Sequence, residues 1–301
     1  GQEITERKNY GKLNSYIEVQ GQVTSVIAGA FAALLLTGTT GNQLELAGLT
    51  FELPFNIAAW EIQEIFLMDA LTYLAVIFIF MIMKYTPVKN NEIHVGGLFS
   101  RLIGGFSYLK AHPFIFVFGI ASYMLFAFTL VEIHIILPSY VHKFLQMDGN
   151  IFASAEIYYS IGAIFSGVLI LRIFRNLNTL ASIIILIAIV SLAFYAMSEY
   201  NILWVFFVGN FILGISNAGV RILRTTYIFN HVPNNLIGRT NSVFSSLNII
   251  VRMILIGVFA LPFFNINDNI KLGYLVGVLL MILSVIPLVV WYRRIILVEK
   301  N

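Results

Sequence analysis

The chain of 301 residues contains no cysteine, which excludes disulfides, thiolate metal sites and cysteine nucleophiles. It also has few charges, because Asp, Glu, Lys and Arg make up only 11% of the residues. A soluble domain carries roughly 25% charged residues. Since 59% of the residues are hydrophobic and the mean hydropathy is +0.87, the composition predicts an integral membrane protein.

Long apolar runs predict eight transmembrane helices, since a helical span needs about 20 apolar residues. Their ranges are 19–38, 63–85, 113–138, 152–172, 180–198, 202–222, 242–263 and 273–292. The first is the most polar, because Gln20, Gln22, Thr24 and Ser25 occupy its first turns. We expect Pro138 to end the third span.

The basic residues support this number of spans. With both ends of the chain cytoplasmic, 15 of the 18 Lys and Arg lie in cytoplasmic segments, and only Lys143 and Lys271 lie in outside loops. This asymmetry follows the positive-inside rule. In the cytoplasmic segment 86–112, apolar residues at helical spacing over 98–109 predict an amphipathic helix on the membrane surface.

Two stretches of the chain echo each other. GKLNS at 11–15 returns as GRTNS at 238–242, and GAFAAL at 29–34 returns as GVFAL at 257–261. Coincidence in apolar sequence is one explanation. The other is a parallel repeat of six spans, because the copies lead into the first and the seventh span from the same side. The chain would then hold two spans of one unit and six of the next, with four spans missing in front.

Several motifs resemble the major facilitator superfamily, and within it the bacterial macrolide- and drug-efflux-like branch. FLMDALTYL (66–74) looks like the sixth helix of that branch, and GFSYLKAHPFI (105–115) looks like the start of the seventh. LPSYV (137–141) resembles the outer end of the seventh helix, and SIGAIFSGVL (160–169) resembles the eighth. HVPNNLIGRTNSVFSS (231–246) resembles the loop between helices ten and eleven. The resemblance runs in order along essentially the whole chain.

This resemblance implies an all-α membrane protein with twelve helices in two six-helix halves, of which this chain holds eight. Residues 1–85 would end the N-terminal half, 86–112 would link the halves, and 113–301 would form the C-terminal half. The implied function is a secondary transporter of the bacterial cytoplasmic membrane that exports drugs or other small molecules in exchange for protons. Its partners would be the lipid bilayer, a small-molecule substrate, protons and the missing helices one to four, without nucleic acid or a cofactor.

Polar side chains inside the spans are functional candidates, because an ionisable group at the bilayer centre costs at least about 2.5 kcal/mol. Arg252 lies midway along its span, and Asn248 is one turn away on the same face. Arg252 would either bind an anion, a substrate or a titrating carboxylate, or form a structural ion pair between the halves. Asp69 is a candidate proton site, although a shallow residue that orients its helix is the favoured interpretation.

Three further candidates lie in other spans. Glu132 would face the central cavity, whereas His134, two residues away, points elsewhere on the helix and is interpreted as interfacial. Asn210 and Asn217 are seven residues apart and share one face of a Gly-rich helix. They would contact substrate or form ordinary interhelical hydrogen bonds.

The cytoplasmic basic residues have a simpler interpretation. We take Arg221, Arg224 and Arg239 as charges that set the membrane orientation. Arg239 is also a candidate gate residue that clamps the cytoplasmic loop to a helix end in the outward-open state, and Lys12 would do the same in the other half.

Other functional classes find little support in the motifs. There is no HExxH, and the five His residues are scattered. No GxxxxGK[ST] motif is present to bind ATP. The sequence therefore predicts that the chain is not an enzyme. A non-transporting remnant or a helical partner subunit stays the alternative to a transporter.

Overall fold

In the computed structural model, the described residues are 5–39, 43–46, 49–52, 54, 56–83, 97–147, 149–266 and 268–300. They belong to two compact units, one of Gly1–Val23 with Gly96–Asn301 and one of Thr24–Val95. Each unit is described by itself. The division at 85 and 112 expected from the sequence concerns the two halves of a transporter and stays a prediction.

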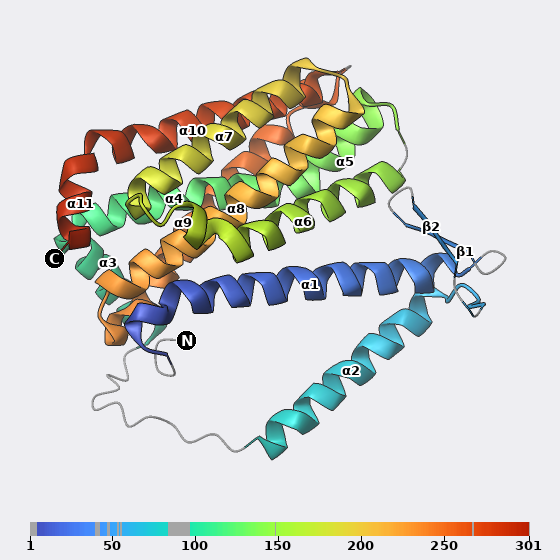
Figure 1. The fold of residues 1–301 in the computed structure, drawn as a ribbon, viewed down its shortest axis with the longest axis horizontal. Coiled ribbons are helices and arrows are strands. Elements are labelled where there is room, and N and C mark those ends of the chain that lie inside the picture. Colours follow the sequence, from blue (N-terminus) through green and yellow to red (C-terminus); the bar gives the residue numbers. More distant parts are fainter. Residues whose placement is uncertain are drawn as a thin grey trace. The chain divides into compact units, whose positions relative to one another are not determined.

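The first unit is a bundle of long helices that run alongside one another (Figure 1). It also holds two π-helical segments, at Glu132–Ile136 and Tyr140–Phe144. Its helices are the part of α1 (Tyr10–Thr37) up to Val23, α3 (Leu98–Ala111), α4 (Pro113–Val131), α5 (Leu137–Ser139), α6 (Gly149–Ile173), α7 (Thr179–Glu199), α8 (Leu203–His231), α9 (Asn234–Phe259), α10 (Leu272–Val290) and α11 (Tyr292–Lys300).

The second unit contains the rest of α1, a β-hairpin and α2 (Ile62–Ile82). The hairpin pairs β1 (Gln43–Leu46) with β2 (Leu49–Glu52) in antiparallel fashion, with Gln43 opposite Glu52. It is a short addition to an otherwise helical fold that the sequence did not predict. A capping box starts α2, because the Glu64 carboxylate accepts a hydrogen bond from the Glu61 backbone N–H at 2.8 Å.

Seven helical segments in the described part are long and apolar enough to cross a membrane. They are Ile62–Ile82, Pro113–Phe144, Ser154–Ile173, Thr179–Glu199, Leu203–His231, Asn234–Phe259 and Asn269–Val290. These segments coincide with seven of the predicted spans, so the all-α membrane fold is confirmed. The predicted span 19–38 also forms a helix, as part of α1, but it is not among the seven.

The helix that contains Pro138 is longer than expected. We predicted that Pro138 ends the span, whereas the helical segment continues to Phe144. Proline lacks the N–H that an α-helix uses, and its ring crowds the preceding turn. Here the turns on both sides of the short α5 are π-helical, and such wider turns accommodate a break in the regular hydrogen bonding.

Glycines allow α6 and α8 to pack backbone against backbone. A Cβ atom on Gly214 of α8 would overlap the carbonyl oxygen of Tyr159, and one on Gly162 of α6 would overlap that of Phe211. Small residues at such positions are the usual means by which membrane helices approach closely. The Gly-rich character of α8 therefore serves close packing.

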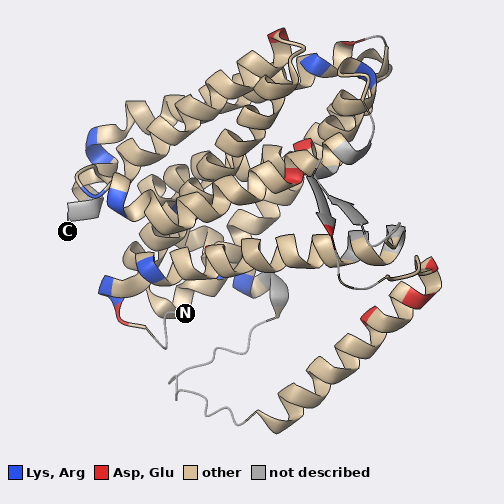
Figure 2. Cartoon of the chain, turned by 45° about the vertical axis from the view of Figure 1, so that its right-hand side comes forward, with Lys and Arg blue, Asp and Glu red and all other residues tan. Residues whose placement is uncertain are grey.

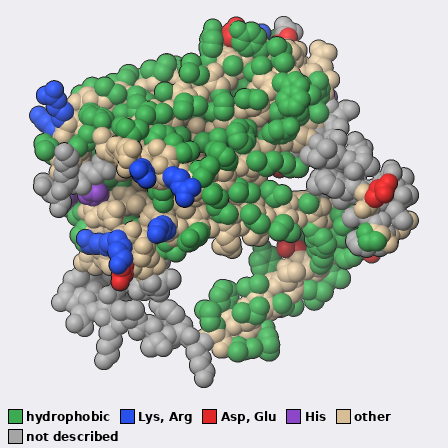
Figure 3. Space-filling model, viewed as in Figure 1, with side chains coloured by type: hydrophobic (Ala, Val, Ile, Leu, Met, Phe, Trp, Pro, Cys, Tyr) green, Lys and Arg blue, Asp and Glu red, His purple; other side chains and the backbone are tan. Residues whose placement is uncertain are grey.

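Charge and apolar surface are separated on the first unit. Lys and Arg gather at the end of the helix bundle where the C-terminus lies (Figure 2). Hydrophobic side chains cover much of the face that Figure 3 shows. Exposed apolar residues of the first unit include Leu192 of α7 and Met253 of α9, which are 70% and 66% exposed. An apolar wall between polar ends suits a protein that is surrounded by lipid.

Candidate functional site

A buried ion pair connects α1 to α8. The Arg221 guanidinium on α8 donates a hydrogen bond from Nη2 to Oε1 of Glu18 on α1. The Glu18 side chain is 7% exposed and the Arg221 side chain is 33% exposed. Gln22, one turn further along α1, donates to the same Glu18 oxygen at 3.0 Å. This carboxylate is therefore held by two donors in a largely dry environment.

Neighbouring polar residues extend this contact to α6. Asn217, one turn before Arg221, donates from Nδ2 to the Tyr159 hydroxyl of α6 at 2.7 Å. At the other end, Asn14 of α1 donates from Nδ2 to Thr226 Oγ1 of α8 at 3.0 Å. We call this set of side chains the polar layer: Asn14, Glu18, Gln22, Tyr159, Asn217, Arg221 and Thr226.

The polar layer forms because the three helices approach closely. A Cβ atom on Gly167 of α6 would lie 2.5 Å from Cγ2 of Val19 on α1. A Cβ atom on Gly11 of α1 would lie 3.2 Å from Cδ1 of Leu171 on α6. Residues three or four apart on a helix share a face, which aligns Asn14 with Glu18, and Asn217 with Arg221.

Arg224 is buried one turn beyond Arg221, and the interpretation of both residues as orientation charges stays a prediction. Its side chain is 3% exposed, and its Nη1 donates to the Ser122 carbonyl of α4 at 2.9 Å. Its Cζ lies 3.6 Å from the centre of the Tyr123 ring, a cation–π contact. The buried Nε has no hydrogen-bond partner among the described residues.

Tyr123 also connects Arg224 of α8 to α9. Its carbonyl oxygen accepts a hydrogen bond from Asn248 Nδ2 at 3.4 Å, and Asn248 is 3% exposed. Arg252, one turn further along α9, is half-buried. Its Nε is buried without a partner within the described part of the chain. The roles assigned to Asn248 and Arg252 stay predictions.

Glu132 lies apart from the polar layer, in the first π-helical segment. It is fully buried, and its Oε1 accepts a hydrogen bond from the Tyr274 hydroxyl of α10 at 2.8 Å. Its Oε2 has no partner among the described residues. His134, by contrast, is exposed. The two side chains thus have different environments, as their spacing indicated.

The structure brings only some of the predicted residues together. Asn217 belongs to the polar layer, whereas Asn210 donates from Nδ2 to the Phe206 carbonyl of its own helix at 2.9 Å. Asp69 is exposed on α2 and belongs to the other unit. Lys12 is exposed on α1. The Arg239 side chain packs against α3, since a Cβ atom on Gly104 of α3 would lie 3.4 Å from its Nη1.

Sequence reasoning did not select Glu18, Tyr159 or Arg224. Part of the signal was present, because Asn217, Arg221 and Arg224 follow one another at helical spacing on one face of α8. Glu18 lies just before the predicted span 19–38, where a charge is expected at the membrane surface. Within the described residues, no group of three His, Asp or Glu side chains could hold a metal ion.

Comparisons with known proteins agree on the fold. The family model of the Major Facilitator Superfamily matches residues 2–256. The fold is similar to the crystal structure of a bacterial homologue of the iron transporter ferroportin in an outward-facing state, with a TM-score of 0.64 and 16% sequence identity. That similarity covers 97% of this chain, which spans 66% of the other chain's length. A search of curated proteins finds no match. Because the family model covers most of its residues, this chain belongs to the Major Facilitator Superfamily.

Proposed function

We propose that the chain is part of a secondary transporter that exports drugs or other small molecules in exchange for protons. The observation that carries this proposal is the Glu18–Arg221 ion pair, at which α1 meets α8. In a carrier that works by alternating access, one side of the substrate pathway must close while the other opens. An ion pair between helices can break and form again, so the polar layer suits such a closing contact.

Glu132 is the proposed coupling residue. A buried carboxylate loses the hydrogen bonds of water, and it needs several donors or a cation to replace them. Glu132 has one donor, Tyr274, and its second oxygen has none among the described residues. Uptake of a proton removes the buried charge, and release of that proton requires access to water. The proton would thereby be tied to the conformation of the carrier.

The drug-efflux assignment is the finer part of the proposal and rests on motifs. FLMDALTYL and GFSYLKAHPFI resemble the macrolide- and drug-efflux-like branch. The transport pathway would be lined by helices that carry Asn217, Asn248 and Arg252. Its location would be the bacterial cytoplasmic membrane, with the arginine-rich helix ends on the cytoplasmic side in accordance with the positive-inside rule.

The first experiment measures export of a labelled macrolide antibiotic by the full-length protein in proteoliposomes with an imposed proton gradient. We expect uphill export that a protonophore abolishes. In Glu132→Gln, we expect proton-driven export to fall by at least about 100-fold while exchange of labelled for unlabelled macrolide continues, because only the proton site is lost. Glu199→Gln is the matched control, since Glu199 is exposed at the end of α7.

The outcomes separate the parts of the proposal. Export that persists with the protonophore would contradict proton coupling. Proton-driven export that survives in Glu132→Gln would remove Glu132 from the coupling role. A wild-type protein that neither exports nor exchanges any compound of a drug panel would favour a remnant or a partner subunit.

A further inference from the structure

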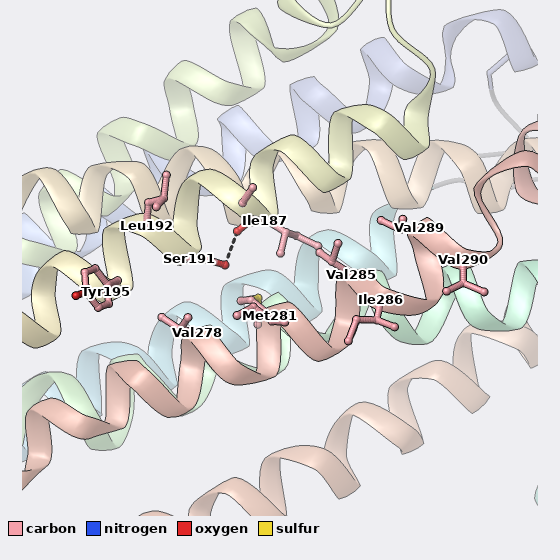
Figure 4. A pocket seen from close by; sticks show the side chains of 12 residues that line it. Ile187, Ser191, Leu192, Tyr195, Val278, Met281, Val285, Ile286, Val289 and Val290 are labelled. Carbon is pink, nitrogen blue, oxygen red and sulfur yellow. Dashed lines mark hydrogen bonds between the residues drawn. The ribbon is translucent and has the colours of Figure 1, made fainter.

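A groove of about 630 Å³ runs between α7 and α10 on the first unit, and Figure 4 shows side chains of both helices facing it. Its walls include Ile187, Ala188 and Ser191 from α7, and Met281 and Val285 from α10. The Ser191 hydroxyl has no hydrogen left to donate to a ligand, because it donates to the Ile187 carbonyl of its own helix at 2.7 Å. The groove is therefore almost wholly apolar.

The groove opens on a face that contacts hydrocarbon. Both helices belong to segments that are long and apolar enough to cross a membrane. Among the lining residues, Leu192 and Val290 are 70% and 69% exposed. Side chains on such a face contact lipid chains rather than water, since the bilayer is their solvent. A flexible acyl chain fits both the shape and the polarity of this groove.

One end of the groove is basic. Asn178, which caps α7 by accepting from the Ala181 N–H at 2.8 Å, donates from Nδ2 to the Tyr292 hydroxyl at 2.9 Å. This bond holds the start of α11 against the start of α7. The next two residues, Arg293 and Arg294, are both exposed.

These arginines follow the lining of the groove closely along the chain. The helix α10 ends at Val290, the last lining residue, and after a turn at Trp291 the chain continues as α11 from Tyr292, which places Arg293 and Arg294 three and four residues beyond Val290. No ion pair within the described residues involves either guanidinium group. An apolar channel that ends at two available guanidinium groups has the polarity of a phospholipid, with its acyl chain at one end and its phosphate at the other.

We propose that this groove binds an anionic phospholipid, with an acyl chain between α7 and α10 and the phosphate at Arg293 and Arg294. The choice of an anionic headgroup follows from charge. A phosphate whose headgroup carries no compensating cation gains most from two arginines, and basic pockets between membrane helices on the cytoplasmic side bind such headgroups. This site lies on the outer wall of the bundle and does not depend on the proposed transport activity.

Lipid retention on the full-length protein tests the proposal. The protein is purified in detergent, incubated with equal amounts of phosphatidylglycerol and phosphatidylcholine, and analysed by native mass spectrometry. We expect wild type to retain phosphatidylglycerol preferentially. The double variant R293Q/R294Q should lower that preference by at least about tenfold, whereas R293K/R294K should keep most of it because the charge remains. The control R7Q/K8Q removes two adjacent exposed cations elsewhere and should change nothing.

A second pair of variants tests the groove itself. Ala188→Trp fills the groove and should reduce retention of both lipids, whereas Ile189→Trp adds the same ring to a neighbouring exposed position outside the lining and should not. Equal binding of the two lipids by wild type would overturn the choice of an anionic lipid. Undiminished phosphatidylglycerol binding by both R293Q/R294Q and Ala188→Trp would overturn the site.

Discussion

At the scale of single residues, Arg224 has an unfavourable environment for its charge. A guanidinium group that loses water needs hydrogen bonds or a carboxylate in return. Arg224 has the Ser122 carbonyl and the Tyr123 ring, while its Nε has no partner among the described residues. Arg221, three residues away, also has a buried Nε without a partner in the described part of the chain, but its guanidinium group is paired with the carboxylate of Glu18. The two arginines should therefore contribute to stability with opposite signs.

Replacement of each arginine by Met tests this contrast, because Met is unbranched and of similar length. Arg221→Met leaves the Glu18 carboxylate buried without its cation, and we expect a loss of about 3–5 kcal/mol in the free energy of unfolding. Arg224→Met removes a charge that lacks a carboxylate, and we expect no loss or a small gain of stability. Thermal unfolding of the full-length protein in detergent measures both. A larger loss in Arg224→Met than in Arg221→Met would contradict the assignment of the ion pair.

For these residues, the sequence indicated which polar side chains are buried more reliably than it indicated which residues they contact. Glu132, Asn217 and Asn248 stood out because they are polar within apolar runs, and all three are buried. The partners of Arg221 could not be predicted in the same way. Glu18 is 203 residues away along the chain, and only the packing of α1 against α8 brings the two together.

At the scale of elements, the α6–α8 contact depends on the absence of side-chain atoms. The Tyr159 carbonyl occupies the space that a Cβ on Gly214 would need. The Tyr159 hydroxyl also accepts the hydrogen bond from Asn217 in the polar layer. Any separation of these two helices therefore disturbs the polar layer as well as the packing.

Two glycine-to-alanine variants should change the stability of the protein in opposite directions. Gly214→Ala forces α6 and α8 apart, and we expect a loss of about 1–3 kcal/mol of stability. Gly257→Ala in α9 meets nothing within 4 Å, so its Cβ is accommodated freely. That variant should gain up to about 1 kcal/mol from the higher helix propensity of alanine. Melting temperatures in detergent compare the two, and a stabilised Gly214→Ala would contradict the close contact.

The elements were predictable where one physical signal dominated. Continuous apolar runs located seven spans, because a bilayer requires about 20 such residues whatever the neighbours are. The continuation past Pro138 was missed, since π-helical turns depend on the packing of the surrounding helices. The hairpin at Gln43–Glu52 was missed as well, because two strands of four residues carry a weak pattern.

For the molecule as a whole, the ion pair is proposed to keep one end of the pathway closed. Ser15 of α1 lies one turn from Glu18 and is 6% exposed. Because these 301 residues contain no cysteine, Ser15→Cys would be their sole thiol and would report access to the polar layer.

The expected result is an increase in labelling when the pair is broken. In inside-out vesicles, a membrane-impermeant maleimide should react with Ser15→Cys at least about tenfold faster after Glu18→Gln, because 1.4 kcal/mol shifts an equilibrium tenfold. The exchanged pair E18R/R221E should recover part of the protection. Equal labelling in all three backgrounds would show that the ion pair closes nothing.

One helix carries the boundary between the two compact units. The division falls between Val23 and Thr24, in the middle of α1, only five residues beyond Glu18. The α-helix itself is continuous across this division, since it runs from Tyr10 to Thr37. Glu18 is therefore carried by a regular helix whose backbone is fixed by hydrogen bonds between residues four apart, and its carboxylate is held at Arg221 more precisely than a loop could hold it.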